Sequence, residues 1–214
     1  VEGQLWYNST SGTYKISVGG AGAWSSGGNL NEAREQPGGA GVSQTTGICF
    51  GGLVPNAEPT RYLDQTELYN GSTWTEVNNL GTGRSLLQGA GTTTAALGFG
   101  GGNPAPPFLT LTEKFDGTNW TDVNDVTTGR VNAAGYGTST AANAVGGEDH
   151  IANYEQYDGT NWSETTDINT ARQKLTGCGT TTAGLVFGGQ TPGETYTGAT
   201  ELWNGSTWTE VADL

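Results

Sequence analysis

Four arginines recur at one position of the sequence, and they are the residues best suited to bind a charged group. Each lies ten residues after a tryptophan and opens the pattern R-x4-G-x-G; they are Arg34, Arg84, Arg130 and Arg172. Four guanidinium groups arranged about an axis could bind carboxylates or anionic sugars, because a guanidinium presents a planar fork of donors. A glutamate also recurs seven residues before each of the last four repeated tryptophans, as Glu67, Glu113, Glu155 and Glu201. We therefore favour a structural interpretation, in which buried Arg–Glu pairs fix one repeat to the next.

The repeated aromatic residues have two interpretations as well. The tryptophans that define the repeat are Trp24, Trp74, Trp120, Trp162 and Trp208, and five residues before the last four stand Tyr69, Phe115, Tyr157 and Trp203. Such side chains could stack on sugars, but each buried aromatic also brings a large apolar area to a core. Because aliphatic residues are few in this chain, we favour the core.

The sequence contains no recognisable catalytic or metal-binding motif. Its one histidine, His150, follows Glu148 and Asp149, but a metal site would need a second set of ligands. No G-x-S-x-G motif presents a nucleophile, and no G-x4-G-K-[ST] motif binds nucleotide phosphates. A glycosidase would need paired carboxylates, yet the expected inner strands carry none. We expect no catalytic residue, metal or cofactor.

Each repeat contains the signals of four short strands. In one copy, the strand QGAGTTT (88–94) follows the arginine, and the strand AALGFGG (95–101) ends at a Gly pair. Two further strands form a hairpin such as TELYNGSTWTEV (66–77), in which Asn70-Gly71 supplies the positive φ angles of a tight turn. Runs with a period of 3.6 residues, which helical repeats of this length require, are absent. The expected fold class is all-β.

These motifs resemble the kelch repeat, which folds as one four-stranded blade of a β-propeller. The resemblance implies a single propeller domain over residues 1–214, with full blades at 34–80, 84–126, 130–168 and 172–214. Residues 1–30 are expected to form a partial blade with strands LWYN (5–8), TYKIS (13–17) and AWSS (23–26). We expect five blades, and the alternative is a piece of a larger ring or fibre.

A narrower resemblance concerns the short hairpins. The near-identical copies NGSTWTEV at 70–77 and 204–211 are similar to propeller segments in tailed-phage virion proteins, and the first 30 residues resemble the strand pairs of phage tail fibres. This implies a virion or extracellular location and a non-enzymatic surface or tail-fibre module that contacts host glycan or another virion protein. One alternative is an architectural subunit completed by a neighbouring chain as a homo-oligomer. A propeller glycoside hydrolase is the third hypothesis.

The connections between the second and third strands differ most among the repeats, and they are candidates for a binding surface. They span 53–65, 103–111, 148–153 and 190–199 and should all emerge on one face. Loops on a rigid scaffold commonly carry recognition residues, and these loops contain Arg61, Tyr62, Phe108, His150 and Tyr196. Ordinary drift between duplicated repeats explains the same variation equally well.

Composition excludes several classes of protein. With 8 basic and 21 acidic residues the net charge is −13, and no Lys/Arg cluster exists, so we expect no nucleic-acid binding. No apolar run approaches the roughly 20 residues that cross a bilayer, so membrane insertion is not expected. Cys49 and Cys178 belong to no metal-binding pair, and we expect two buried free thiols rather than a disulfide. The absence of Met leads us to expect a segment of a longer protein.

Overall fold

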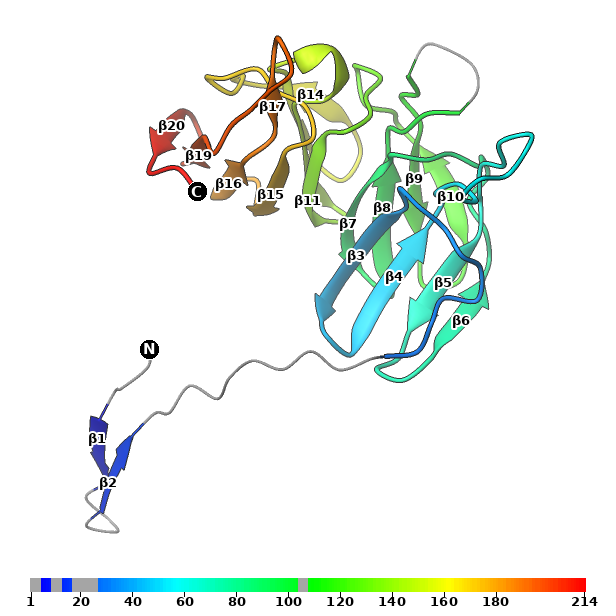
Figure 1. Ribbon diagram of the computed structural model, residues 1–214, viewed down its shortest axis with the longest axis horizontal. Coiled ribbons are helices and arrows are strands. Elements are labelled where there is room, and N and C mark those ends of the chain that lie inside the picture. The colour runs from blue at the N-terminus through cyan, green and yellow to red at the C-terminus, as the bar shows by residue number, and fades with distance from the viewer. Residues whose placement is uncertain (1–4, 9–12, 17–26, 104–107) are drawn as a thin grey trace.

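The computed structural model describes residues 5–8, 13–16, 27–103 and 108–214 (Figure 1). These residues form an all-β structure, as predicted, in which one short 3-10 turn, η1 (Glu148–His150), is the helical element. Within the described ranges, no helix is long and apolar enough to span a bilayer. Trp24 and the strand predicted at 23–26 lie outside these ranges.

The two earliest strands are where the sequence predicts them. β1 (Leu5–Asn8) and β2 (Thr13–Ile16) pair antiparallel as a two-stranded sheet of their own.

The four repeats from residue 34 onward each form one four-stranded antiparallel sheet, which confirms the predicted unit. The first sheet contains β3 (Gly38–Ser43), β4 (Thr46–Phe50), β5 (Thr66–Tyr69) and β6 (Trp74–Val77). The second contains β7 (Gln88–Thr92), β8 (Ala95–Phe99), β9 (Thr112–Phe115) and β10 (Trp120–Val123). The third contains β11 (Ala134–Thr138), β12 (Ala141–Val145), β13 (Tyr154–Tyr157) and β14 (Trp162–Glu164). The fourth contains β15 (Thr176–Gly179), β16 (Gly184–Phe187), β19 (Thr200–Trp203) and β20 (Trp208–Val211).

The tight hairpins are held by their own side chains. Between β5 and β6, the Asn70 side-chain oxygen accepts hydrogen bonds from the backbone N–H groups of Ser72 and Thr73, at 3.0 and 2.9 Å. Gly71 has a φ of 96°, which glycine adopts without steric cost. The Asn/Asp-Gly pattern therefore fixes the register of the outer strands, as the sequence predicts.

The sheets lie in an arc, with their first strands in succession (Figure 1). β3 contacts β7, β7 contacts β11, and β11 contacts β15. Apolar clusters fill the spaces between successive sheets. We call the side of a sheet that packs on the following sheet its forward face, and the opposite side its back face. Between the first two sheets, Ile48 and Phe50 on the forward face pack against Ala96 and Phe115 on the next back face.

The Gly pairs join neighbouring sheets through the backbone. The N–H of Gly52 donates to the carbonyl of Arg84 at 2.8 Å, although these residues belong to different sheets. A Cβ at Gly51 would lie 2.7 Å from that carbonyl oxygen, and φ at Gly51 is 65°. Only glycine permits this approach. This contact is how the Gly pairs bring neighbouring sheets close together.

The two cysteines are both free, but their environments differ. Cys49 is 8% exposed on the back face of the first sheet, and burial raises the pKa of its thiol to about 11. Cys178 is exposed on β15. The prediction of two buried thiols is therefore wrong for Cys178, because among the described residues no sheet packs on the forward face of the fourth sheet.

Candidate functional site

Each repeated arginine forms an ion pair with the glutamate of its own sheet. The arginine and glutamate side chains are at most 2% exposed in all four sheets. The shortest nitrogen–oxygen distances are 2.5 Å for Arg34–Glu67, 2.5 Å for Arg84–Glu113 and 2.8 Å for Arg172–Glu201, and Arg130 pairs with Glu155 in the same way. Buried and neutralised guanidinium groups cannot bind a soluble anion, so these four arginines form no anion site.

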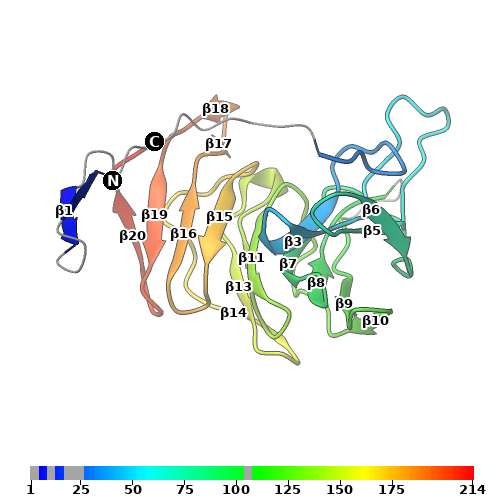
Figure 2. The ribbon, with the colours of Figure 1, turned by 90° about the horizontal axis from the view of Figure 1, so that it is seen from below.

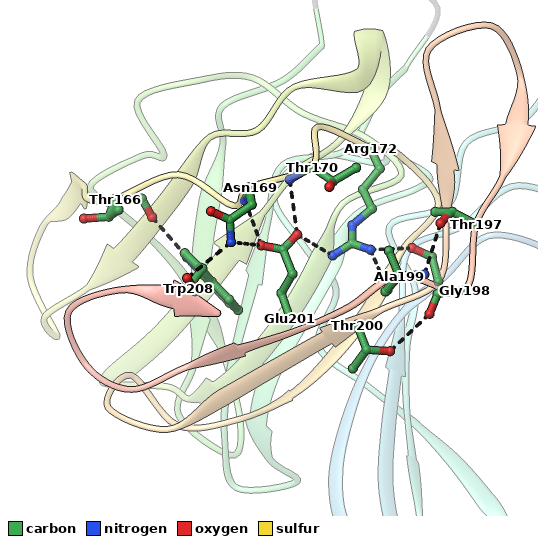
Figure 3. A network of polar contacts seen from close by, with 11 residues as sticks. Thr166, Asn169, Thr170, Arg172, Thr197, Gly198, Ala199, Thr200, Glu201 and Trp208 are labelled. Carbon is green, nitrogen blue, oxygen red and sulfur yellow. Dashed lines mark hydrogen bonds and ion pairs between the residues drawn. The ribbon is translucent and has the colours of Figure 1, made fainter. Parts of the chain in front are cut away.

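Figure 3 shows this arrangement in the fourth sheet. Arg172 also donates to the carbonyl of Ala199 at 2.5 Å, and the second carboxylate oxygen of Glu201 accepts from the backbone and side-chain N–H groups of Asn169, at 2.7 and 2.8 Å. The N–H of Thr170 donates to the first oxygen at 3.3 Å. Burial lowers the pKa of Arg172, and the charge of Glu201 opposes that shift. Both members of the buried pair are thus held by several hydrogen bonds.

The glutamates also hold the chain that arrives from the preceding repeat. The second carboxylate oxygen accepts a backbone N–H from this segment in every sheet: from Asn31 to Glu67 at 2.7 Å, Gly81 to Glu113 at 2.6 Å, Thr127 to Glu155 at 2.7 Å and Asn169 to Glu201 at 2.7 Å. We predicted that the Arg–Glu pair itself joins one repeat to the next. The ion pair instead lies within one sheet, and the glutamate makes the connection, mainly through its other oxygen.

The variable connections lie together at one end of the sheets. In each sheet the strands follow one another in antiparallel order, so the second-to-third connection and the fourth-to-first connection share an end. Hydrogen bonds from the Gly pairs to the arginine carbonyls of the next sheet keep these ends aligned. In Figure 2 the hairpin of β17 (Gln190–Thr191) and β18 (Thr195–Tyr196) and the cyan 53–65 loop project on the same side. We call this end the loop face.

The five predicted binding residues differ in accessibility on the loop face. Tyr196 is 75% exposed and Phe108 is 37% exposed. Tyr62 and His150 are partly buried. The Arg61 side chain is 53% exposed and forms an ion pair with Glu32 at 3.0 Å. The loop face therefore presents two aromatic side chains to solvent, while its one exposed arginine already has an acidic partner.

The His150 cluster does not converge on a metal. Glu148 accepts a hydrogen bond from the Asn132 side chain at 2.6 Å, and Asp149 is exposed. Across the described residues, no group of three or more His, Cys, Asp and Glu side chains is placed to hold a metal ion. Asp149 and His150 have φ angles of 63° and 54°, which are uncommon for residues other than glycine.

Sequence reasoning missed the residue that anchors Tyr196, the most exposed of the described aromatic side chains. Gln190 is 2% exposed; its side-chain oxygen accepts from Lys174 Nζ at 3.0 Å, and its nitrogen donates to Glu194 at 2.5 Å. These contacts fix the β17–β18 hairpin that carries Tyr196. Gln190 directly follows a Gly pair, where the other sheets have unrelated residues, so the repeat pattern gave no signal for it.

The chain matches no protein-family model and no curated protein.

Proposed function

We propose that the four sheets are blades of a kelch-like β-propeller, with residues 1–30 as a fifth, partial blade. The proposal is supported by the succession of the four first strands and by the repeated Arg, Gly-pair and aromatic–Trp motifs. We further propose a non-enzymatic binding and structural module at the surface or tail fibre of a phage or other virion. In that role the protein contacts host-surface glycan or another virion protein, and its location is virion or extracellular.

The observation that carries the binding role is the contrast between the repeated scaffold and the loop face. The buried Arg–Glu pairs recur unchanged in four sheets, whereas the connections above them differ in length and composition. Those connections present Tyr196 and Phe108 to solvent. An exposed aromatic ring offers a flat apolar surface, and a rigid scaffold holds it in place at low entropic cost.

A glycan array probed with the purified chain, together with cross-linking in purified particles, tests this function. We expect binding that is lost in Tyr196→Ala and Phe108→Ala. Val42→Ala is the matched control, because Val42 is a 73% exposed apolar residue at the opposite end of the sheets. Retention of binding in both loop-face variants, or absence of any glycan or virion-protein contact in the wild type, would refute the proposal.

A second candidate function is architectural, as a subunit completed by a neighbouring chain. It is favoured by a separate observation: the arc ends in two sheet faces on which no described sheet packs.

A further inference from the structure

The forward face of the fourth sheet carries apolar side chains, and no described sheet packs on it. Cys178, Leu185 and Leu202 stand opposite one another on β15, β16 and β19, in one row across the sheet. Leu202 is 45% exposed, Cys178 is exposed, and Leu185 is partly exposed. Phe187, two residues after Leu185 on the same face, is also partly exposed.

The same positions are buried wherever a sheet follows. Leu185 corresponds in the repeat to Ile48 and Leu97, which are 3% and 0% exposed. Phe187 corresponds to Phe50 and Phe99, both 0% exposed. The side chains at these positions are equally apolar in the first, second and fourth sheets. Their exposure therefore differs because a following sheet covers the first two and no described sheet covers the fourth.

No described sheet packs on the back face of the first sheet, at the other end of the arc, where residues 27–31 contact Tyr69 and Trp74. Tyr69 and Trp74 are partly exposed there and pack on each other with ring centroids 5.0 Å apart. The residues equivalent to Tyr69 are Phe115, Tyr157 and Trp203, at 0%, 2% and 3% exposure, each covered by the forward face of the preceding sheet. Gly47 is also partly exposed, whereas its equivalents Ala96 and Ala142 are 0% exposed.

We propose that a second copy of this chain covers the forward face of the fourth sheet with the back face of its own first sheet. This head-to-tail contact rests on the architectural function, in which a neighbouring chain takes the place between the fourth and first sheets that residues 1–30 would otherwise fill as a partial blade. It deepens that function by naming the partner and both surfaces. The internal contacts supply its geometry: Phe50 packs on Trp120, and Phe99 on Trp162, each with ring centroids 4.8 Å apart. By the same contact, Phe187 packs on the partner's Trp74.

The contact joins two different surfaces, so each copy keeps one free face until the assembly closes. Such heterologous contacts produce a ring if the rotation closes and an open chain if it does not. Either product satisfies the proposal.

Two measurements on the purified chain test association. Sedimentation velocity from about 1 to about 100 µM, a range that brackets micromolar affinity, should show assembly. Reaction of Cys178 with a thiol reagent should slow over the same range, while Cys49 stays unreactive in its buried position. A monomer throughout, with constant Cys178 reactivity, would overturn the proposal.

Charged substitutions test whether the back face of the first sheet and the forward face of the fourth sheet are the surfaces that associate. Gly47→Glu blocks the back face without disturbing one copy, because a Cβ there meets Trp74 and Tyr69 only at 3.9 Å. Gly47→Ala is its control, since alanine occupies the covered equivalents. Leu185→Glu blocks the forward face. We expect each glutamate variant to weaken association at least about 100-fold, because a buried unpaired carboxylate is costly, and Gly47→Ala to associate normally.

Mixing the two glutamate variants makes the decisive measurement. Each retains the face that the other lacks, so the mixture should form a 1:1 dimer although neither variant associates alone. The head-to-tail contact is refuted if the mixture fails to associate or if Gly47→Glu associates normally. If Leu185→Glu does not fold, comparison of Gly47→Glu with Gly47→Ala still tests the contact. Tyr196→Ala should leave association unchanged, so failure of the glycan proposal is distinguishable from failure of this one.

Discussion

Replacing Glu113 by Gln should reveal how much the buried ion pairs contribute to stability. The change keeps the shape of the side chain but removes its charge. One carboxylate oxygen of Glu113 accepts from Arg84 Nη1 at 2.5 Å, and the other accepts from the N–H of Gly81 at 2.6 Å. A glutamine offers one oxygen and one NH2 group, so it leaves a donor facing a donor on one side and a buried guanidinium without a counter-charge.

The expected loss follows from the burial of this pair. Arg84 and Glu113 side chains are 0% and 2% exposed, and removing one partner of such a pair costs about 3 to 5 kcal/mol. For a domain of this size, each kcal/mol lost from the unfolding free energy lowers the melting temperature by about 2 to 4 °C. The melting temperature of Glu113→Gln should therefore fall by roughly 6 to 20 °C.

Thermal and urea unfolding, followed by tryptophan fluorescence, measure this effect. Asp122→Asn is the control, because Asp122 lies opposite Glu113 on β10 but is exposed; its unfolding free energy should change by less than about 0.5 kcal/mol. Arg84→Met with Glu113→Gln should cost less than the sum of the single variants. A loss below about 1 kcal/mol in Glu113→Gln would show that the buried pair contributes little to stability.

Three further predictions concern other parts of the scaffold. Gly89→Ala should destabilise by about 1 to 3 kcal/mol in urea unfolding, because the new Cβ would lie 2.2 Å from a carbonyl oxygen of β3; wild-type stability would contradict this. A thiol reagent at pH 8 should modify Cys178 and not Cys49 in the folded chain, and both in denaturant, because burial raises the pKa of Cys49 to about 11; two reactive native thiols would contradict it. Hydrogen bonds from backbone N–H groups lower the pKa of the Asp116 and Asp158 carboxyl groups. The two carboxylates therefore contribute fully to folding stability above the ordinary pKa of about 3.9, and this stability is lost as the pH falls through the lowered folded-state pKa. The melting temperature should fall less on acidification in the double variant Asp116→Asn with Asp158→Asn than in the wild type. An equal fall in both proteins would contradict the role given to these carboxylates.

Repetition explains which parts of the fold were predictable from sequence. The strands could be predicted because a strand assignment had to fit all four repeats at once. Each repeat has the R-x4-G-x-G pattern, the Gly pair and the aromatic–Trp spacing. Periodicity also shows which side chains share a face of a sheet. It does not show whether another sheet covers that face, and this is why the exposure of Cys178 was predicted wrongly. Gln190 was missed for the opposite reason, since a residue found in one repeat alone leaves no pattern.

The charge distribution limits which ligand charges the loop face can accept. Four of the eight basic residues are the buried arginines, and Arg61 is paired with Glu32. The exposed carboxylates of Asp149 and Glu194 on loop-face connections outnumber the exposed Lys174, which donates to Gln190. A surface with a net charge of one sign repels ligands of the same sign over about 10 Å at moderate salt. A glycan that binds beside Tyr196 should therefore be neutral or cationic. On the array, neutral saccharides should bind more strongly than their sialylated or phosphorylated forms, and a preference for the anionic forms would mean that the aromatic loops are not the contact surface.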